Sequence, residues 1–344
     1  MRNAALACLM TLLVLILWSV PAAADNDEAE YEEAFSRTEP LAATGRVDLN
    51  NISGDVHIKT WNRDEVKIDA MKRSEAATAE AARKNAARVT IEVTRQTCCL
   101  MIETKYPEGR NALKKFNVSV DYTLTVPTGA RVVATTVSGD IDASSMAGLA
   151  KLTTVSGNVE ASKMKNGGVF TSVSGNVRLE ESTGDVEVST VSGEITLSDV
   201  SGSVKAEAVS GAVTGEQLAG AELVNVSTHS GDIVYEGSIS PEGRYTFESY
   251  SGSVSVILPA NAEFDFECET FSGHIQSDFR FESETTGKAR EHEFDFRSIH
   301  GTVNGGGADV TLSSFSGPIE LRTEGRGRTK EPRTREGHRE TDED

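Results

Sequence analysis

The sequence is poor in cysteine, proline, aromatic residues and positive charge. Its 344 residues include 4 Cys and 8 Pro, only 6% are aromatic, and 34 Lys and Arg stand against 53 Asp and Glu, for a formal net charge of −19. This balance argues against a nucleic-acid binder, because phosphate contacts need clustered Lys and Arg. At 38%, apolar residues are too many for a disordered chain and too few for a protein with several membrane spans.

The scarcity of cysteine excludes a disulfide framework. Beyond Cys8, which lies in an apolar leader, there remain only Cys98, Cys99 and Cys268, an odd and low number even for an oxidising compartment. No CxxC or Cys/His spacing typical of a zinc site is present. Cys268 lies in an apolar column described below and is predicted to be a buried small hydrophobic residue.

Only one long apolar run is present, from Ala4 to Val20. Arg2 precedes it and an Ala-x-Ala signal ends at Ala24, a pattern typical of a signal peptide cleaved before Asp25. The alternative is an uncleaved anchor, although the run is slightly short for a membrane span. We therefore predict export to the periplasm, the cell surface or the medium, with no transmembrane segment in the mature chain.

The main signal in the sequence is an internal repeat. An apolar-Ser-Gly tripeptide recurs at a spacing of 18 residues between Gly139 and Gly211 and less regularly elsewhere, with His300 in the Ser position at Gly301. The predicted structural glycines are Gly54, Gly139, Gly157, Gly175, Gly193, Gly211, Gly231, Gly252, Gly273, Gly301 and Gly317.

Alignment on these glycines reveals apolar columns seven and five residues before and two residues after each glycine, as at Ala150, Leu152 and Val159. They alternate with polar residues, which is the period of a strand with one buried face. One unit cannot enclose a core, but stacked units bury their apolar columns and pair their backbones in parallel. The pattern predicts an all-β fold, a parallel β-helix or β-solenoid of about eleven coils.

The regions outside the repeat are predicted to be a cap and a tail. Residues Ala70 to Ala87 are rich in Ala, Glu, Lys and Arg, with Ser74 as a candidate N-cap, and are predicted to form one helix. Strands are expected at Val89 to Val93, Cys99 to Thr104 and Val118 to Val126. The chain thus divides into a signal peptide at 1–24, a flexible segment at 25–43, a first coil and N-terminal cap at 44–131, solenoid repeats at 132–322 and a disordered charged tail at 323–344.

The repeat contains Val137-Ser138-Gly139-Asp140-Ile141, Val155-Ser156-Gly157-Asn158-Val159 and Val173-Ser174-Gly175-Asn176-Val177, and it is accompanied by Asn51 to Val56, Val120-Asp121-Tyr122, Val126-Pro127-Thr128-Gly129 and a last coil from Thr311 to Gly317. In these motifs the sequence resembles the DUF4097 family of bacterial exported proteins, which are regarded as adhesin-like. The resemblance covers residues 44 to 322. It implies a right-handed parallel β-helix on the envelope or outside the cell, and it carries no catalytic residues.

No catalytic constellation emerges from the sequence. The position after each Ser-Gly is polar but mixed, and its Asp and Asn residues suit turns beside glycine. His229, His274 and His300 occupy three different columns, which argues against a stacked metal triad. There is no P-loop, GxGxxG or Ser/His/Asp spacing. We therefore predict a non-enzymatic protein with no catalytic or cofactor-binding residues.

One acidic pattern suggests a cation. Acidic residues from Glu263 to Glu269 alternate with apolar ones, and a similar pattern follows at 291–295. Alignment on Gly273 and Gly301 would stack three like-charged pairs in adjacent coils, which Ca²⁺ is able to bridge. The candidate metal ligands are Glu263, Asp265, Glu267, Glu291, Glu293 and Asp295. The competing interpretation is a solvated acidic face.

Three functions are compatible with these features. The first is an adhesin-like surface that binds an envelope protein or glycan. The second is an envelope scaffold that associates end to end, suggested by a last coil, Phe315 to Leu321, with no evident cap. The third is an enzyme acting on polysaccharides, a class that β-helices also include, although no convergent group of carboxylates and basic residues supports it.

Overall fold

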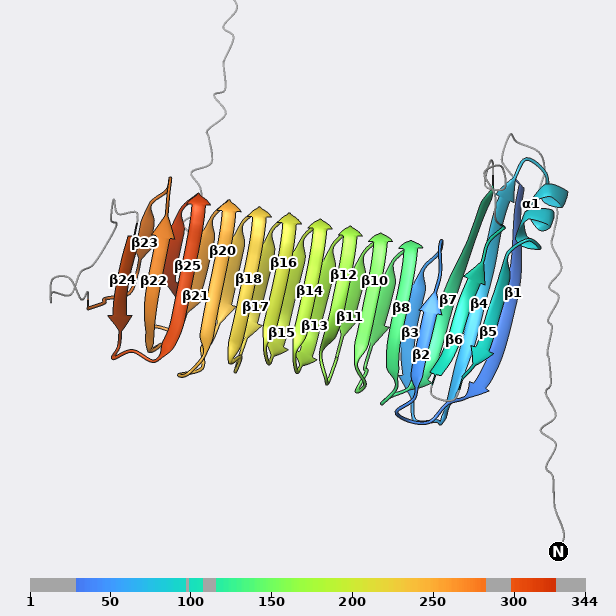
Figure 1. Ribbon diagram of the computed structural model, residues 1–344, viewed down its shortest axis with the longest axis horizontal. Coiled ribbons are helices and arrows are strands. Elements are labelled where there is room, and N and C mark those ends of the chain that lie inside the picture. The colour runs from blue at the N-terminus through green and yellow to red at the C-terminus, as the bar shows by residue number, and fades with distance from the viewer. Residues whose placement is uncertain (1–28, 97–98, 108–115, 283–297, 326–344) are drawn as a thin grey trace, which may run out of the picture.

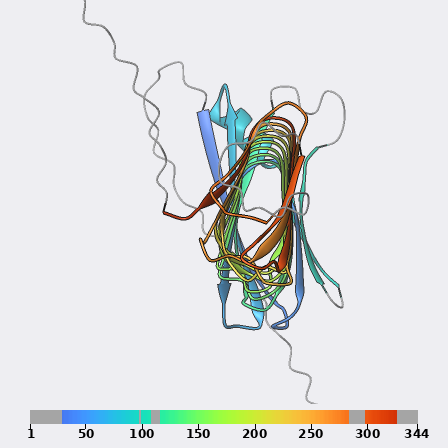
Figure 2. The same ribbon diagram turned by 90° about the vertical axis from the view of Figure 1, so that its left-hand side faces the viewer.

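The computed structural model describes residues 29–96, 99–107, 116–282 and 298–325, which form a rod made of two facing sheets (Figure 1). Each sheet has 13 strands. Viewed along the rod, the coils superpose as a narrow oval (Figure 2). The signal peptide, the tail from residue 326 and the segment 283–297 lie outside the described residues.

The strands are given in spatial order from the N-terminal end of the rod. Sheet A contains β1 (Ala29–Pro40), β4 (Glu65–Ala76), β7 (Asn117–Pro127), β3 (Val56–Trp61), β9 (Ile141–Ser144), β11 (Val159–Ser162), β13 (Val177–Thr183), β15 (Ile195–Ser201), β17 (Val213–Leu218), β19 (Ile233–Gly237), β21 (Val254–Leu258), β26 (Ile319–Thr323) and β23 (Ile275–Ser277). Sheet B contains β5 (Thr90–Arg95), β6 (Cys99–Lys105), β2 (Arg46–Asn50), β8 (Arg131–Ser138), β10 (Ala150–Ser156), β12 (Gly168–Ser174), β14 (Val186–Ser192), β16 (Val204–Ser210), β18 (Leu223–Ser230), β20 (Arg244–Ser251), β25 (Ala308–Ser316), β22 (Phe264–Thr270) and β24 (Ser298–Val303).

The predicted inward columns form the core. In β10, Ala150 and Leu152 are buried while Lys151 between them is exposed, and Leu152 pairs with Ala134 on one side and Phe170 on the other. Each rung therefore consists of a sheet B strand, a Ser-Gly corner and a sheet A strand, and it is named here by its corner glycine. The burial of these apolar columns drives the stacking, because no single rung encloses a core.

The C-terminal rungs are not stacked in the order of the sequence. The Gly317 rung, made of β25 and β26, lies between the Gly252 and Gly273 rungs. Gly301 does not belong to the corner column, because β24 runs antiparallel to β22 and places Gly301 opposite Phe266. The rod thus contains ten stacked Ser-Gly rungs. On the N-terminal side of the Gly54 rung, β6 pairs in parallel with β2, and β7 pairs in parallel with β3.

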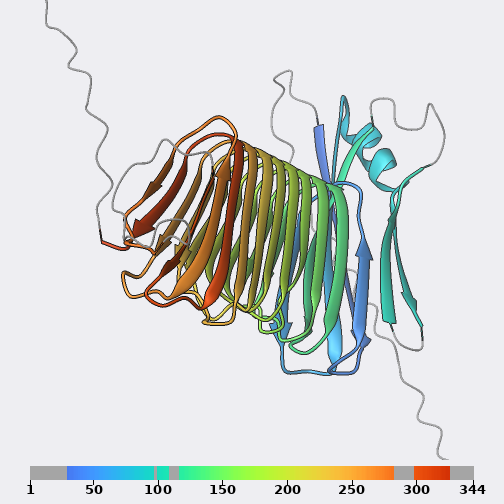
Figure 3. The same cartoon turned by 60° about the vertical axis from the view of Figure 1, so that its left-hand side comes forward.

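The N-terminal cap differs from the prediction in two respects. The segment predicted to be flexible contains β1, which pairs antiparallel with β4 along its whole length. The predicted helix is α1 (Ala79–Ala86), capped by Thr78 and not by Ser74, and it lies beside β1 and β4 (Figure 3). Helix-forming composition misled the prediction at residues 70–76, where an alternating burial pattern and pairing on both sides place the chain in β4. The three predicted strands are present as β5, β6 and β7.

Aromatic side chains fill the C-terminal end of the rod. Phe264 and Phe266 of β22 point into the core and meet Phe279 and Phe281 in edge-to-face contacts, with ring centroids 5.3 and 5.1 Å apart. All four side chains are buried. The coil from Phe315 to Leu321 lies between the Gly252 and Gly273 rungs, so the prediction of an uncapped end at this coil is wrong.

Candidate binding surface

The Ser-Gly corners form a rigid edge. At Gly175, with φ +155°, an added Cβ would collide with the carbonyl oxygen of Gly157, and the same relation recurs along the column. In eight of the ten rungs, a buried Ser or Thr three residues before the glycine donates its hydroxyl hydrogen to the carbonyl oxygen of the neighbouring corner glycine, as Thr154 does to Gly139 at 2.9 Å. Close packing and a hydrogen bond at each step hold successive corners in fixed positions.

The polar residues after the corner glycines have a structural role. The Asp140 carboxylate accepts a hydrogen bond from the backbone N–H of Asn158 at 2.7 Å, and the Asn158 side-chain oxygen accepts one from the N–H of Asn176 at 2.9 Å. The same link joins Asp232 to Ser253. This column therefore connects one corner to the next, as expected for a turn role and not for a catalytic one.

The apolar residue of each corner tripeptide points outward. It lies two residues before the glycine, out of phase with the inward positions of its strand, so its side chain is on the outer surface near the arrowhead end of the sheet B strand (Figure 1). Nine of these side chains are 39–58% exposed. We call this column the corner ridge; in spatial order it is Ile52, Val137, Val155, Val173, Val191, Val209, His229, Tyr250, Phe315 and Phe271.

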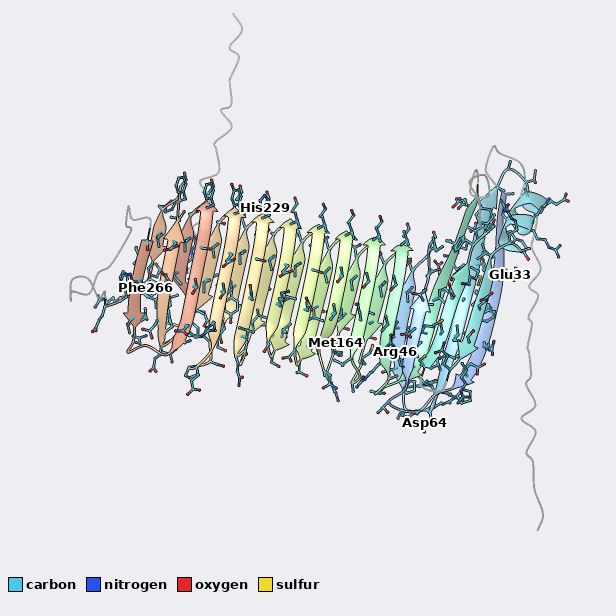
Figure 4. All side chains as sticks on the ribbon, viewed as in Figure 1. Glu33, Arg46, Asp64, Met164, His229 and Phe266 are labelled. Carbon is cyan, nitrogen blue, oxygen red and sulfur yellow. The ribbon has the colours of Figure 1, made fainter. Side chains whose placement is uncertain are left out.

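The C-terminal part of the corner ridge is an aromatic ladder. The ring centroids of His229 and Tyr250, of Tyr250 and Phe315, and of Phe315 and Phe271 are each 4.8 Å apart, with interplanar angles of 9°, 0° and 3°. Figure 4 places His229 on the upper edge of the rod. Because the rings lie face to face, the ladder presents ring edges along its length, and both faces of Tyr250 and of Phe315 are covered by neighbouring rings.

A groove of about 940 Å³ runs along the sheet B side of the corner ridge. Its wall includes the ridge from Val173 to Phe271, and its other lining residues are mostly Ser and Thr, together with three glutamates, Glu207, Glu248 and Glu269. No Lys or Arg is found among the described residues that line it. The groove is thus apolar on one side and acidic on the other.

Three of the six carboxylates predicted to bind calcium, Glu263, Asp265 and Glu267, belong to the described residues. Of the six, Glu291, Glu293 and Asp295 lie outside the described residues. Since β24 is antiparallel to β22, Glu267 lies opposite His300 and Asp265 opposite Thr302, whose hydroxyl donates to the Asp265 carboxylate at 2.6 Å.

Glu263 immediately precedes β22, and its backbone oxygen accepts a hydrogen bond from the N–H of Ala308. Within the described ranges, no group of three or more His, Cys, Asp or Glu side chains is arranged to hold a metal ion. Calcium binding stays a prediction.

The histidines are dispersed. His229 belongs to the corner ridge, His274 follows the Gly273 corner, and His300 lies on β24. A different histidine, His57, accompanies a small polar pocket on sheet A, where its Nδ1 lies 2.7 Å from an Asp142 carboxylate oxygen. Both side chains are almost half exposed, and this pair is a solvated contact between two rungs.

Cys268 is fully buried in the core, as predicted, and burial raises the pKa of its thiol. Cys268 is buried because it belongs to an inward column, where its neighbours are apolar residues of adjacent rungs such as Leu312. The structure contains no helix, among the residues it describes, that is long and apolar enough to cross a membrane.

Sequence reasoning missed the corner ridge, although a signal was present. The inward positions lie seven, five and three residues before each glycine, and the apolar residue two before it has the opposite parity. A strand directs residues of opposite parity to opposite faces. The tripeptide that identified the repeat therefore also predicts an exposed apolar column.

The fold and this surface define a class: a β-solenoid of nearly identical parallel rungs with an exposed apolar edge. The chain belongs to the Toastrack DUF4097 family, whose model matches residues 45–322. This confirms the resemblance carried by the Val-Ser-Gly motifs. A search among proteins with curated functions finds no relative of this chain.

Several solved structures are similar to this chain. A candidate cell adhesion protein from Clostridium sporogenes shares 11% identity at a TM-score of 0.23, covering 85% of this chain and 100% of that one. A candidate adhesin from Bacteroides fragilis shares 13% identity at a TM-score of 0.34, and one from Parabacteroides distasonis shares 10% at 0.28. Each of these two matches covers 84% of this chain and 97% of the other.

Proposed function

We propose that this protein is an exported, non-enzymatic binding protein of the bacterial envelope, and that the corner ridge with its groove is the contact surface. The observation that carries the proposal is the continuous column of exposed apolar side chains on a rigid backbone edge. A contiguous exposed apolar surface on a soluble fold is typical of an interaction site. The leader at residues 1–24 supports export.

The arrangement suits recognition more than chemistry. The hydroxyls of the corner column bond to backbone carbonyls, and the Asp and Asn column bonds to backbone N–H groups, so both sets of polar side chains are already engaged. The exposed apolar column has no such internal partner in the rung. Burial of a Val or Phe side chain that is half exposed gains about 1 kcal/mol, and many in a row give a usable binding surface.

Site-specific photo-crosslinking in the native envelope tests this function. A photoreactive amino acid is placed at Val209 on the corner ridge and, as a matched control, at Glu216, an exposed position on sheet A of the same rung. We expect discrete adducts from Val209 and none from Glu216. The proposal fails if Val155, Val209 and Phe315 all give no adduct, or if Glu216 gives the same adducts.

The other two functions have no specific observation in their favour. End-to-end association was suggested by an uncapped last coil, but aromatic side chains fill that end of the rod. An adduct of twice the monomer mass in the crosslinking experiment would revive self-association, through the ridge and not through the end. Turnover on a panel of acidic polysaccharides is the measurement that would revive an enzyme.

A further inference from the structure

We propose that the groove binds an extended polypeptide segment in the polyproline II conformation with Lys or Arg at every third position. This rests on the proposed function, since it names the partner chemistry of the same surface. It is argued from the spacing of the groove's carboxylates, the orientation of the aromatic rings and the pairing of the backbone beneath them.

The carboxylates in the groove alternate with serines from rung to rung. Along the outward column next to the corner ridge, the register pairs Glu207 with Ser227, Ser227 with Glu248, Glu248 with Ser313 and Ser313 with Glu269. Insertion of the Gly317 rung produces this order, because it separates Glu248 from Glu269. Three negative charges therefore lie two rungs apart along the groove.

This spacing fits a polyproline II helix. The ladder rings are 4.8 Å apart per rung, so two rungs separate the carboxylates by about 9.6 Å. A polyproline II helix rises about 3.1 Å per residue with three residues per turn, which places every third side chain on one side at about 9.3 Å intervals. In a β-strand, side chains on one face repeat at about 6.7 Å, which does not match.

The backbone of sheet B also disfavours an added strand. The sheet B strands of the rungs from Gly175 to Gly273 each lie between two other strands, so the groove lies over a sheet face and offers no free edge for strand addition. A polyproline II segment needs no such edge, because its backbone remains solvated. Proline-rich segments dock in aromatic-lined grooves elsewhere for this reason.

The orientation of the ladder argues against a sugar ligand. Carbohydrate stacking requires an accessible ring face, but Tyr250 and Phe315 cover each other's faces at 4.8 Å. Their edges form an apolar wall suited to prolyl rings and to the methylene stems of Lys and Arg. The occupant favoured by the ladder is therefore a polypeptide.

The charges of the groove are available to a cationic partner. Within the described part of the chain, neither Glu248 nor Glu269 forms an ion pair. Glu207 contacts Lys205 of its own strand at 3.0 Å, but both side chains are about half exposed, and such pairs are weak. A basic segment would thus replace the solvated Lys205 contact at Glu207 and form two new ion pairs, with Glu248 and Glu269.

Binding of two labelled peptides by fluorescence anisotropy tests the inference. The first is (Pro-Pro-Lys)₃, and the second, Lys-Lys-Lys-(Pro)₆, has the same composition with clustered charges. We expect the evenly spaced peptide to bind at least tenfold more tightly, with an affinity that falls as salt is raised. Equal affinities for the two peptides, or no binding of either, would overturn the inference.

Two double variants test whether the groove carboxylates bind the basic residues of the peptide. Glu248→Gln with Glu269→Gln removes two groove carboxylates, and Glu216→Gln with Glu236→Gln removes two exposed ones from sheet A. We expect the first pair to weaken peptide binding by about five- to twentyfold, since each exposed ion pair contributes up to about a fivefold factor. The sheet A pair should leave it unchanged, and equal effects would contradict the site.

Other occupants of the groove are distinguished by the same binding assay and by sedimentation. Glucosamine oligomers that bind more tightly than the peptide would assign the groove to an amino sugar, and a Phe315-dependent dimer in sedimentation would assign it to a second copy; either result overturns the inference. If neither peptide binds but Val209 still crosslinks to an envelope partner, this inference fails and the proposed function stands. If the spaced peptide binds but no ridge position crosslinks, the proposed function fails instead.

Discussion

The rings of Tyr250 and Phe315 stack in parallel with their centroids 4.8 Å apart, although their strands, β20 and β25, are not consecutive in the chain. This contact exists because the last Ser-Gly segment inserts between two rungs that precede it in sequence. The insertion extends the aromatic ladder, separates the groove glutamates and makes the Gly273 rung the outermost one.

Cysteine crosslinking checks the rung order. Thr246 and Thr311 are outward-facing neighbours, and Thr311 also pairs with Glu267, so Thr246 and Glu267 lie two rungs apart. In a chain with Cys98 and Cys99 replaced by Ser, Thr246→Cys with Thr311→Cys should form a disulfide on mild oxidation, since paired strands meet the Cα distance that a disulfide needs. Thr246→Cys with Glu267→Cys should not. The opposite outcome would mean that the rungs follow the sequence order.

The corner glycines should differ sharply from a loop glycine. Gly175→Ala places a Cβ against the Gly157 carbonyl oxygen, whereas an added Cβ at Gly220 meets nothing within 4 Å. At Gly220, φ is +66°, so Gly220→Ala should cost about 1–2 kcal/mol from backbone strain alone. We expect Gly175→Ala to cost clearly more, about 3 kcal/mol or above, as for other overpacked or strained sites. Urea unfolding of both variants measures this, and equal losses would contradict the close approach.

The Gly211 rung lacks the corner hydroxyl. Thr190 donates to the Gly175 carbonyl at 3.0 Å and Thr228 to the Gly211 carbonyl at 3.1 Å, but the equivalent position in the rung between them is Ala208. Ala208→Thr should supply the missing hydrogen bond to Gly193 and raise the unfolding free energy by about 1 kcal/mol. Ala208→Val, which adds the same bulk without a hydroxyl, is the control. If Val stabilises as much as Thr, the gain comes from packing.

Stability should decline at alkaline pH. Burial raises the pKa of Tyr122 to about 12, and its hydroxyl lies 2.7 Å from that of Thr104. An unfolded tyrosine titrates near pH 10, so the unfolded state loses its proton first. Stability is therefore unaffected by this group below about pH 10 and falls by up to about 1.4 kcal/mol per pH unit between pH 10 and 12.

The Tyr122→Phe variant isolates this contribution. It removes the hydroxyl contact with Thr104, so we expect it to be about 1 kcal/mol less stable near neutral pH. Its stability should then fall less steeply above pH 10 than that of the unchanged protein. Urea unfolding at pH 8, 10 and 11.5 compares the two slopes. Parallel slopes would show that Tyr122 does not contribute to the alkaline loss.

The regular part of the fold was predictable from the sequence. Columns such as Leu152 and Val159 recur at a spacing of 18 and are buried as expected. Composition was less informative at β4, where residues that favour a helix, such as Ala70 and Lys72, lie in a strand between β1 and β7. There the pairing of neighbouring strands outweighs the weak intrinsic preference of each residue.

The candidate site was predictable only in part. The exposed column was implied by the parity of Val155 and its equivalents, but the groove glutamates were not recognisable as a spaced set. In the sequence, Glu248 and Glu269 belong to consecutive Ser-Gly units, an order that predicts adjacent rungs. Only the position of Ser313 between them, given by the inserted rung, sets their spacing.

The sequence by itself determined the rung: an 18-residue period, a glycine where backbones meet, and inward apolar columns that require a neighbour above and below. The tertiary structure decided which rung lies beside which at the ends of the rod. Nearly identical rungs satisfy one another's hydrogen bonds almost equally well, so the columns do not specify an order. Features that occur once distinguish the end, the antiparallel β24 beside β22 and the Phe264 and Phe279 rings in edge-to-face contact, and only the tertiary structure shows that the Gly317 rung lies inside them.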